Sequence, residues 1–137
     1  MDISIHPASM LALIFLLHFV ADFTLQGCLA NLKQEKWWAE QIPKEMQERK
    51  RIKLWRKYQY DYLCGLVCHG FYWSLVVSIP LLLAGGFWYA INAFAHGVLH
   101  VCIDDAKANR MKLNLWQDQA LHALQVMLIW FSWIFVR

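Results

Sequence analysis

Four long apolar segments make up most of the chain, and none of them alternates between apolar and polar residues as a surface strand would. They cover residues 7–28, 60–83, 87–103 and 115–136. Each is close to the ~20 residues that a helix needs to cross ~30 Å of hydrocarbon. Only helices and closed barrels satisfy their backbone in lipid. The pattern therefore predicts an all-α fold, a four-helix transmembrane bundle formed by a single membrane domain over residues 1–137.

Turn and start signals separate these segments. Pro7 suits the first turn of the first helix, because its missing N–H would find no partner there. Gly85 and Gly86 predict a short turn between the second and third segments. The N-terminus lacks the basic stretch and the cleavage site of a signal peptide, so we expect the first segment to be a retained span.

Residues 31–59 differ from the rest of the chain because they are strongly basic. We expect two short helices interrupted at Pro43, which together form a basic amphipathic cytoplasmic hairpin between the first and second spans. Tryptophans among the cations favour a segment that lies on the membrane surface and binds anionic lipid headgroups. A solvated hairpin with a charged face is the alternative, and nucleic acid is not expected as a partner. The nine cations are Lys33, Lys36, Lys44, Arg49, Lys50, Arg51, Lys53, Arg56 and Lys57.

Composition and charge placement indicate a membrane protein and predict its orientation. Hydrophobic residues make up 59% of the chain, against about 45–50% in an average soluble domain. A second basic loop, with Lys107, Arg110 and Lys112, separates the last two segments, whereas the loop before the third segment has no Lys or Arg. The positive-inside rule places both basic loops in the cytoplasm and both termini outside it. We expect a multi-pass membrane protein that could form a homo-oligomer.

Polar side chains interrupt every apolar segment. A charged side chain inside a bilayer costs at least ~2.5–3.5 kcal/mol on insertion scales, so a membrane helix rarely retains one without a use. These residues, His96 apart, fall in the half of each helix nearest the cytoplasm, which predicts one shared polar site. They are His18, Asp22, Gln26, His69, His96, His100, Asp104, Asp118 and His122.

Three His–Asp pairs recur at i and i+4, a spacing that places both side chains on one helix face about 5–6 Å apart. Imidazole and carboxylate ligands suit zinc, with manganese or iron as alternatives. A bundle core built from such pairs can hold one or two ions, so we predict a divalent metal as cofactor. Without metal, the same residues could form a proton relay or a closed hydrogen-bond network. The predicted ligands are His18, Asp22, His100, Asp104 and His122.

Further polar residues are predicted to support this centre. Asp118 would be a ligand or general base, and His69 a ligand or a stabiliser of developing charge. For His69 a hydrogen bond between helices is the simpler alternative. Lys107 could bind a lipid phosphate, and a lysine that only reaches the membrane surface is an equally good interpretation. Residues expected to orient the ligands are Gln26, Gln119 and His96.

The four cysteines show no pattern of a secreted disulfide scaffold. We expect them to be reduced and buried as small hydrophobic side chains. Cys64 and Cys68 lie one helical turn apart beside His69, which leaves a site for a soft metal as an alternative. The other two cysteines are Cys28 and Cys102.

The order of the polar residues resembles an uncharacterised bacterial and phage family of small inner-membrane proteins, a domain of unknown function. The shared pattern is H-x3-D-F-x-L-Q from His18, then Lys33, His69, H-x3-D-x2-K from His100 and D-Q-x2-H from Asp118. The resemblance implies a membrane fold, a place in a bacterial inner membrane and the same site residues, but no reaction. Residues 97–104 are also distantly similar to the G-x-x-S-H-x3-D segment of membrane-bound metal-dependent hydrolases, with Leu99 in place of the usual serine.

Three functions are compatible with this pattern. The first is a metal-dependent membrane hydrolase that acts on a lipid, or on another phosphoester or amide, reached from the cytoplasmic leaflet. The second is a non-enzymatic membrane effector or interaction protein, encoded by a phage or a defence locus, with a structural metal or polar core. The third is an oligomeric pore or proton pathway.

Overall fold

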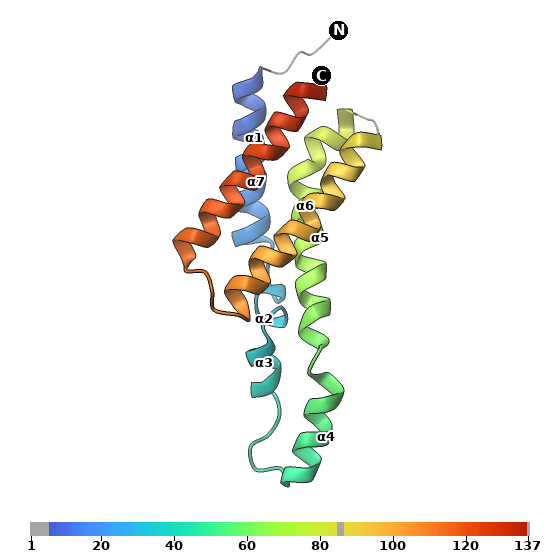
Figure 1. The fold of residues 1–137 in the computed structure, drawn as a ribbon, viewed down its shortest axis with the longest axis vertical. Coiled ribbons are helices and arrows are strands. Elements are labelled where there is room, and N and C mark those ends of the chain that lie inside the picture. The colour runs from blue at the N-terminus through green and yellow to red at the C-terminus, as the bar shows by residue number, and fades with distance from the viewer. Residues whose placement is uncertain (1–5, 85–86, 137) are drawn as a thin grey trace.

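A computed structural model of the chain describes residues 6–84 and 87–136 and confirms the all-α fold (Figure 1). The turn predicted at residues 85–86 and the tail at residues 1–5 lie outside the described residues. Four long elements form the bundle. They are α1 (Pro7–Phe19), which continues into the π-helical turn η1 (Val20–Thr24), α5 (Asp61–Ala84), α6 (Phe87–Ala108) and α7 (Leu115–Val136).

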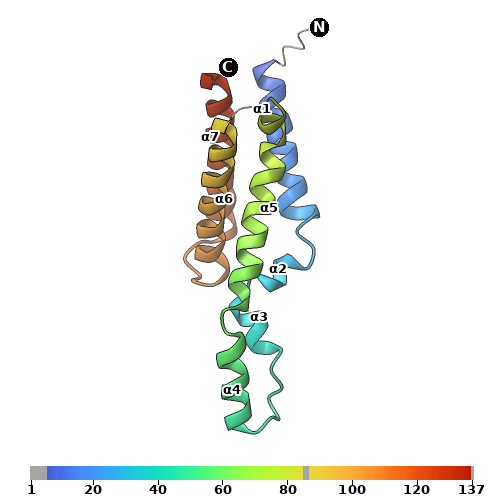
Figure 2. The ribbon, with the colours of Figure 1, turned by 90° about the vertical axis from the view of Figure 1, so that its right-hand side faces the viewer.

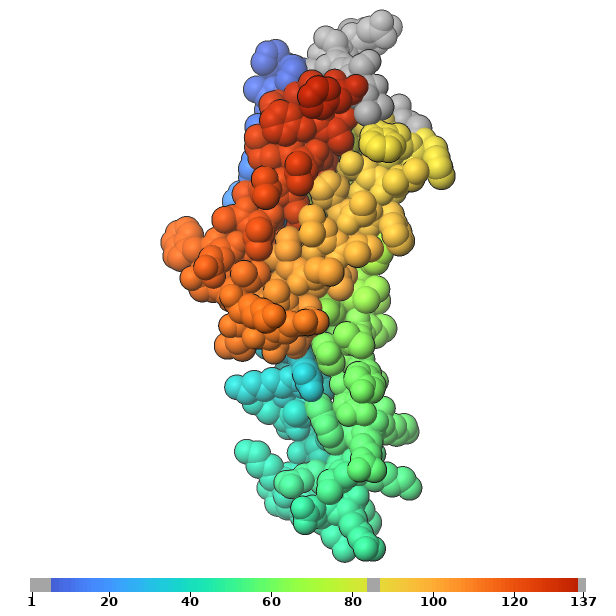
Figure 3. All heavy atoms as spheres, in the orientation of Figure 1, coloured from blue at the N-terminus to red at the C-terminus, as the bar shows by residue number. Residues whose placement is uncertain are grey.

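The basic segment forms two short helices, α3 (Glu35–Glu40) and α4 (Glu48–Tyr58), on either side of Pro43 as predicted, and the short helix α2 (Leu29–Leu32) precedes them. The hairpin of α3 and α4 extends beyond the bundle along its long axis (Figures 1 and 2), and the space-filling view shows it as a narrow projection (Figure 3). No residue of α4 is buried. Only Gln59 and Tyr60 separate α4 from α5, and α4 runs on in nearly the same direction. The structure therefore shows a projecting hairpin and not one that lies flat across the bundle axis.

Two helical stretches of the described chain are long and apolar enough to cross a membrane. They are Pro7–Thr24, with a mean hydropathy of 1.7, and Glu48–Leu83, with a mean hydropathy of 1.8. The prediction of four such segments is thus supported for two. Helices α6 and α7 do not reach the same hydropathy over their described residues, because they contribute most of the buried His, Asp and Gln side chains.

The bundle has an apolar end and a polar end. Both described ends of the chain lie at the apolar end, while the α6–α7 connection and the basic hairpin lie toward the other (Figures 1 and 2). Helices α1, α5, α6 and α7 all contribute to the apolar core, which positions the polar groups below it. The core residues are Met10, Ile14, Ala21, Trp73, Val77, Leu81, Tyr89, Val126, Ile129 and Trp133.

Helices α5 and α6 approach each other closely at two glycines. A Cβ on Gly70 would lie 2.4 Å from Val101 Cγ2 and 3.1 Å from the carbonyl oxygen of Gly97. Such distances are below ordinary van der Waals contact, so a larger residue would force the helices apart. The contact is adjacent in sequence to His69, and it brings this side chain to the face of α6 that carries His100.

The four cysteines are free and exposed, so the expectation that they are buried is wrong. Apolar residues lie on every side of these helices, and hydrophobicity alone therefore did not distinguish the inner face from the outer. Cys64 and Cys68 face outward while His69 is fully buried, and the structure does not assemble them into a soft-metal site.

Candidate metal centre

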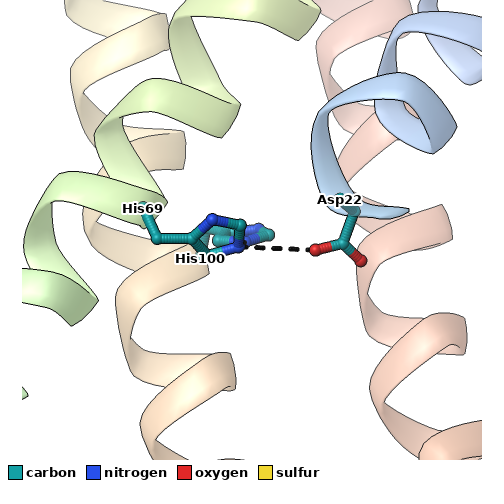
Figure 4. Close-up of side chains that lie close together, drawn as sticks. All are labelled: Asp22, His69 and His100. Atoms are coloured by element: carbon teal, nitrogen blue, oxygen red, sulfur yellow. Dashed lines mark hydrogen bonds and ion pairs between the residues drawn. The ribbon is translucent and has the colours of Figure 1, made fainter. Parts of the chain in front are cut away.

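Polar side chains from η1, α5, α6 and α7 converge below the apolar core. Each is buried, with at most 6% of its surface exposed. Their ligand atoms form two overlapping groups whose atoms all lie within 4.8 Å of one another, a spacing that could hold a metal ion. Figure 4 shows the first group, drawn from three elements. The members are Asp22, His69 and His100 in the first group and His100, Asp104 and His122 in the second.

Asp22 is supplied by the π-helical turn η1. The α-helix ends at Phe19, and the wider turn that follows is of a kind found often at functional sites. The Asp22 carboxylate lies with Oδ1 3.4 Å from His69 Nε2, while its Oδ2 accepts a 3.3 Å hydrogen bond from Gln119. His18 has a different partner, because its Nδ1 accepts a 3.0 Å hydrogen bond from the indole of Trp73. The predicted His18–Asp22 pair is therefore divided between two sets of contacts.

The tautomer of His122 follows from a chain of hydrogen bonds. The Gln125 side-chain amide donates to the backbone carbonyl oxygen of His96 at 3.2 Å, and a carbonyl oxygen can only accept. This orientation turns Gln125 Oε1 toward His122 Nδ1 at 3.1 Å, so Nδ1 must carry the proton and donate it. A hydrogen bond of this kind on one ring nitrogen is how proteins direct the other toward a metal. His122 Nε2 thus faces the centre of the cluster with its lone pair.

The centre that His122 Nε2 faces is surrounded by carboxylate oxygens. Oδ1 of Asp104 and Oδ1 of Asp118 each lie 3.4 Å from this nitrogen. Neither His122 Nε2 nor Asp118 Oδ1, both buried, makes a hydrogen bond within the described chain. A lone pair and two carboxylates repel one another, so a proton or a metal ion between them would stabilise this arrangement.

The distances are compatible with a metal ion. A charge-assisted N–H···O hydrogen bond from an imidazolium would be about 2.7–2.9 Å long. The observed 3.4 Å separations are longer than that. A tetrahedral zinc with bonds of about 2.0–2.1 Å would hold its ligand atoms about 3.3–3.4 Å apart. The separations of His122 Nε2 from the two carboxylate oxygens are of this second length, and His122 and Asp104, unlike Asp118, belong to the second metal-compatible group.

The first group has the same spacing around His69. Its Nε2 lies 3.4 Å from Asp22 Oδ1, 3.4 Å from Asp104 Oδ2 and 3.3 Å from His100 Nε2. The Asp104 carboxylate therefore joins the two groups, with Oδ2 toward His69 and Oδ1 toward His122. A carboxylate in this position can bridge two ions, so the residues fit one or two divalent metals.

Two lysines contact the outer side of the cluster. Lys33 Nζ lies 2.6 Å from Asp104 Oδ2, and Lys107 Nζ lies 2.5 Å from Asp118 Oδ2. The Lys107 contact leaves Asp118 Oδ1 directed at His122. The sequence predicts Lys33 as one of the nine lipid-binding cations. Only its place in the ordered polar pattern distinguishes it from the other eight. The structure removes it from the exposed basic face, because its side chain is only 12% exposed.

Trp73 separates the polar cluster from the apolar core. Its ring stacks on His100 at a centroid distance of 4.2 Å, and His100 stacks in turn on His122 at 4.3 Å. The indole N–H also holds His18, whose ring centroid lies 5.9 Å from that of His122. Nothing distinguished this residue among the eight tryptophans of the chain, and Gln125 was missed as well. Both residues form hydrogen bonds with residues of another helix, and the sequence does not predict how the helices are aligned with one another.

The remaining predicted residues lie around the cluster. Gln119 donates to Asp22 and to Asp118 Oδ2, at 3.3 and 3.1 Å, and so connects two carboxylates. Gln26 donates to the backbone oxygen of Asp22. His96 is buried one turn before His100. Its backbone oxygen accepts a hydrogen bond from the Gln125 amide, and this bond links His96 to the site.

An open crevice of about 460 Å³ gives access to the site. It lies at the polar end of the bundle, between α2, η1, the end of α6 and the start of α7. Amide and ammonium groups line it together with apolar side chains. The lining includes Asp22, Phe23, Gln26, Lys33, Gln34, Asp104, Lys107, Met111, Leu113, Asp118 and Gln119.

Comparisons of the chain with protein-family models, with curated proteins and with solved structures found no match. The chemistry of the chain is therefore argued from the geometry of this site.

Proposed function

We propose that the chain is a metal-dependent membrane hydrolase whose substrate carries a phosphoester group. The observation that carries this proposal is the inward-facing lone pair of His122, 3.4 Å from two carboxylate oxygens and without a hydrogen bond in the described structure. The same atoms adjoin an open crevice of about 460 Å³, within the 300–1,000 Å³ usual for ligand sites. A buried structural site would not need such an opening.

The residues divide into binding and supporting roles. His100, Asp104 and His122 would hold a first ion, with Asp118 beside His122, and Asp22 and His69 would complete a second position that shares His100. A divalent ion held there would polarise a phosphoryl oxygen and make a water nucleophilic at neutral pH. Asp118 could instead act as general base, because it lies at the crevice wall. Gln119 and Gln125 would keep the carboxylates and the His122 ring in place.

The membrane setting belongs to the same proposal. The stretches Pro7–Thr24 and Glu48–Leu83 are apolar enough to cross a bilayer, and α6 and α7 would do so when packed against them, with their polar side chains turned inward. The two basic loops would face the cytoplasm of a bacterium and both termini would lie outside its inner membrane. The crevice would then open near the cytoplasmic leaflet.

The non-enzymatic alternative is supported by the contacts of Lys33. This residue follows α2 and pairs with Asp104 on α6, so the polar cluster also ties the basic hairpin to the bundle. A pore is less compatible with the structure. Trp73 and the apolar core close the site toward the end of the bundle where the described chain begins and ends.

Metal content and lipid turnover test the proposal together. The protein, purified in detergent, should retain at least one equivalent of zinc, manganese or iron by mass spectrometry. In vesicles of total bacterial lipid extract, it should hydrolyse a phospholipid in a reaction that a chelator stops. His122→Ala should lose both the metal and the hydrolysis. His96→Ala is the matched control and should keep both, because the His96 ring lies outside both groups.

Two results would contradict the hydrolase. A folded protein that binds no divalent ion would leave only a proton between His122 and the carboxylates. A loaded protein that leaves every lipid of the extract intact would favour the non-enzymatic alternative, above all if removal of the metal unfolds it.

A further inference from the structure

Two lysines meet in the crevice beside the cluster. Lys33 comes from the end of α2 and Lys107 from the last turn of α6, and both line the same space. Their Nζ atoms contact Asp104 and Asp118, the two carboxylates that approach His122. We infer that Lys33 and Lys107 form a clamp that binds the phosphate group of the ligand. The inference rests on the proposed function for the metal centre but makes a separate claim about the ligand.

Charge balance explains why the clamp would bind an anion. The three carboxylates Asp22, Asp104 and Asp118 outweigh the two ammonium groups by one negative charge when the histidines are neutral. One divalent ion reverses the sign and leaves the site with one positive charge. The ion also draws on the same carboxylates that hold the lysines. An anion should therefore bind much more tightly after the metal than before it.

The chemistry of the crevice favours phosphate over other anions. Lysine is a common point-charge partner of phosphate, and two lysines beside a divalent ion can contact several of its oxygens. Amide groups from Gln26, Gln34 and Gln119 add hydrogen-bond donors to the lining. The positive charges of the lysines and the N–H donors of the amides thus both suit a phosphate group.

Apolar side chains of the same crevice point to the rest of the ligand. Phe23, Met111 and Leu113 line it next to the polar groups. A phosphate ester with an acyl chain would use both kinds of lining, whereas a free phosphate compound would use only the polar one. Both kinds of ligand contain the phosphate group. The binding experiment below distinguishes a lipid headgroup from a free phosphate compound.

The test measures ligand binding and zinc content in the same samples. Purified protein in a non-ionic detergent is prepared free of metal and with added zinc. Calorimetric titration then uses three probes: dihexanoyl phosphatidic acid, inorganic phosphate and uncharged dihexanoylglycerol. The wild type should bind phosphatidic acid at least about tenfold (~1.4 kcal/mol) more tightly with zinc than without it. Dihexanoylglycerol should bind weakly under both conditions.

Lysine variants identify the clamp. Lys107→Gln should weaken phosphatidic acid binding about tenfold without loss of zinc, because Asp118 Oδ2 loses the ammonium group but keeps its hydrogen bond from Gln119. Lys33→Gln leaves a buried acid unpaired and could impair folding, so Lys33→Arg, which should keep binding, is its charge-preserving counterpart. Lys112→Gln, in the same loop region but outside this crevice, is the matched control and should bind as the wild type does.

The outcomes separate the clamp from the hydrolase. Zinc binding with unchanged phosphate affinity in Lys107→Gln would overturn the clamp and leave the metal centre standing. Absence of zinc, with phosphate binding that still depends on Lys107, would support the clamp and contradict the hydrolase. Tighter binding of phosphatidic acid than of inorganic phosphate would assign the phosphate to a lipid headgroup, and equal binding would assign it to a free phosphate compound.

Discussion

The two ends of the bundle are built from the same helices but contain opposite kinds of buried side chain. Around Ile14, Val77 and Ile129, all with 0% exposure, the helices meet through apolar contacts. Below Trp73 the same helices bury carboxylates and imidazoles just as completely. Apolar packing there would avoid the desolvation cost of the charges, and well-packed apolar replacements of buried ion pairs are often neutral or stabilising. The polar end therefore carries a desolvation cost that the apolar end avoids, as expected of the binding role that we propose for it.

This contrast makes a direct prediction about substitutions. Changes at the polar end should remove metal and ligand, with stability falling where a buried charge loses its partner. Changes at the apolar end should lower stability alone. Changes at the α5–α6 contact should moderately lower both metal binding and stability, because that contact holds His69 near His100.

The largest effect is expected from Asp104→Ala. It removes the buried carboxylate that contacts both groups and leaves the part-buried Lys33 ammonium without its partner. Breaking one side of a buried ion pair costs about 3–5 kcal/mol. We expect unfolding in detergent to show this loss and metal analysis to find no bound ion. Asp105→Ala, whose Arg110 partner is 64% exposed, should cost no more than about 1 kcal/mol and keep the metal.

A smaller effect, confined to stability, is expected from Ile129→Ala. The side chain is fully buried in the apolar core, and such truncations cost about 2–5 kcal/mol through the cavity they leave. Thermal unfolding should show the loss, while the zinc content stays that of the wild type. Ile134→Ala, on the same helix but 38% exposed, should change little. Loss of zinc in Ile129→Ala would show that the two ends are not independent.

The smallest effect is expected from Gly70→Ala. The added Cβ would meet Val101 Cγ2 at 2.4 Å, and overpacking of this kind costs about 1–3 kcal/mol. Separation of α5 from α6 should also weaken zinc binding, as competition with a chelator would show. Val101→Ala in the same chain should restore much of both properties. No change in zinc affinity would mean that His69 does not contribute to the ion's site.

Much of the secondary structure could be predicted because helix formation and spacing are local. The predicted segments at residues 60–83 and 115–136 nearly coincide with α5 and α7, while the third helix runs on to Ala108 through polar residues. The i, i+4 pairs on α6 and α7 are in contact, with His100 Nε2 3.7 Å from Asp104 and His122 Nε2 3.4 Å from Asp118. The third pair is divided, because the π-helical turn changes the spacing between His18 and Asp22.

Other parts of the site could not be predicted because they depend on how helices are rotated against one another. Lys33 belongs to a basic stretch by sequence, yet its ammonium group is held by an acid 71 residues away. Trp73 and Gln125 look like ordinary members of apolar helices until α1 and α6 are placed beside them. The cysteines were misassigned for the same reason, since helices that are apolar all round conceal their inner face.

The sequence by itself determined that the chain is helical, that polar residues recur on every long segment and that two His–Asp pairs share a helix face. These properties follow from backbone geometry within a few residues. The tertiary structure alone decided that Asp104 joins two groups, that Gln125 turns the His122 lone pair inward and that two lysines meet in one crevice. Such contacts depend on distances between helices, which packing sets and local spacing does not encode.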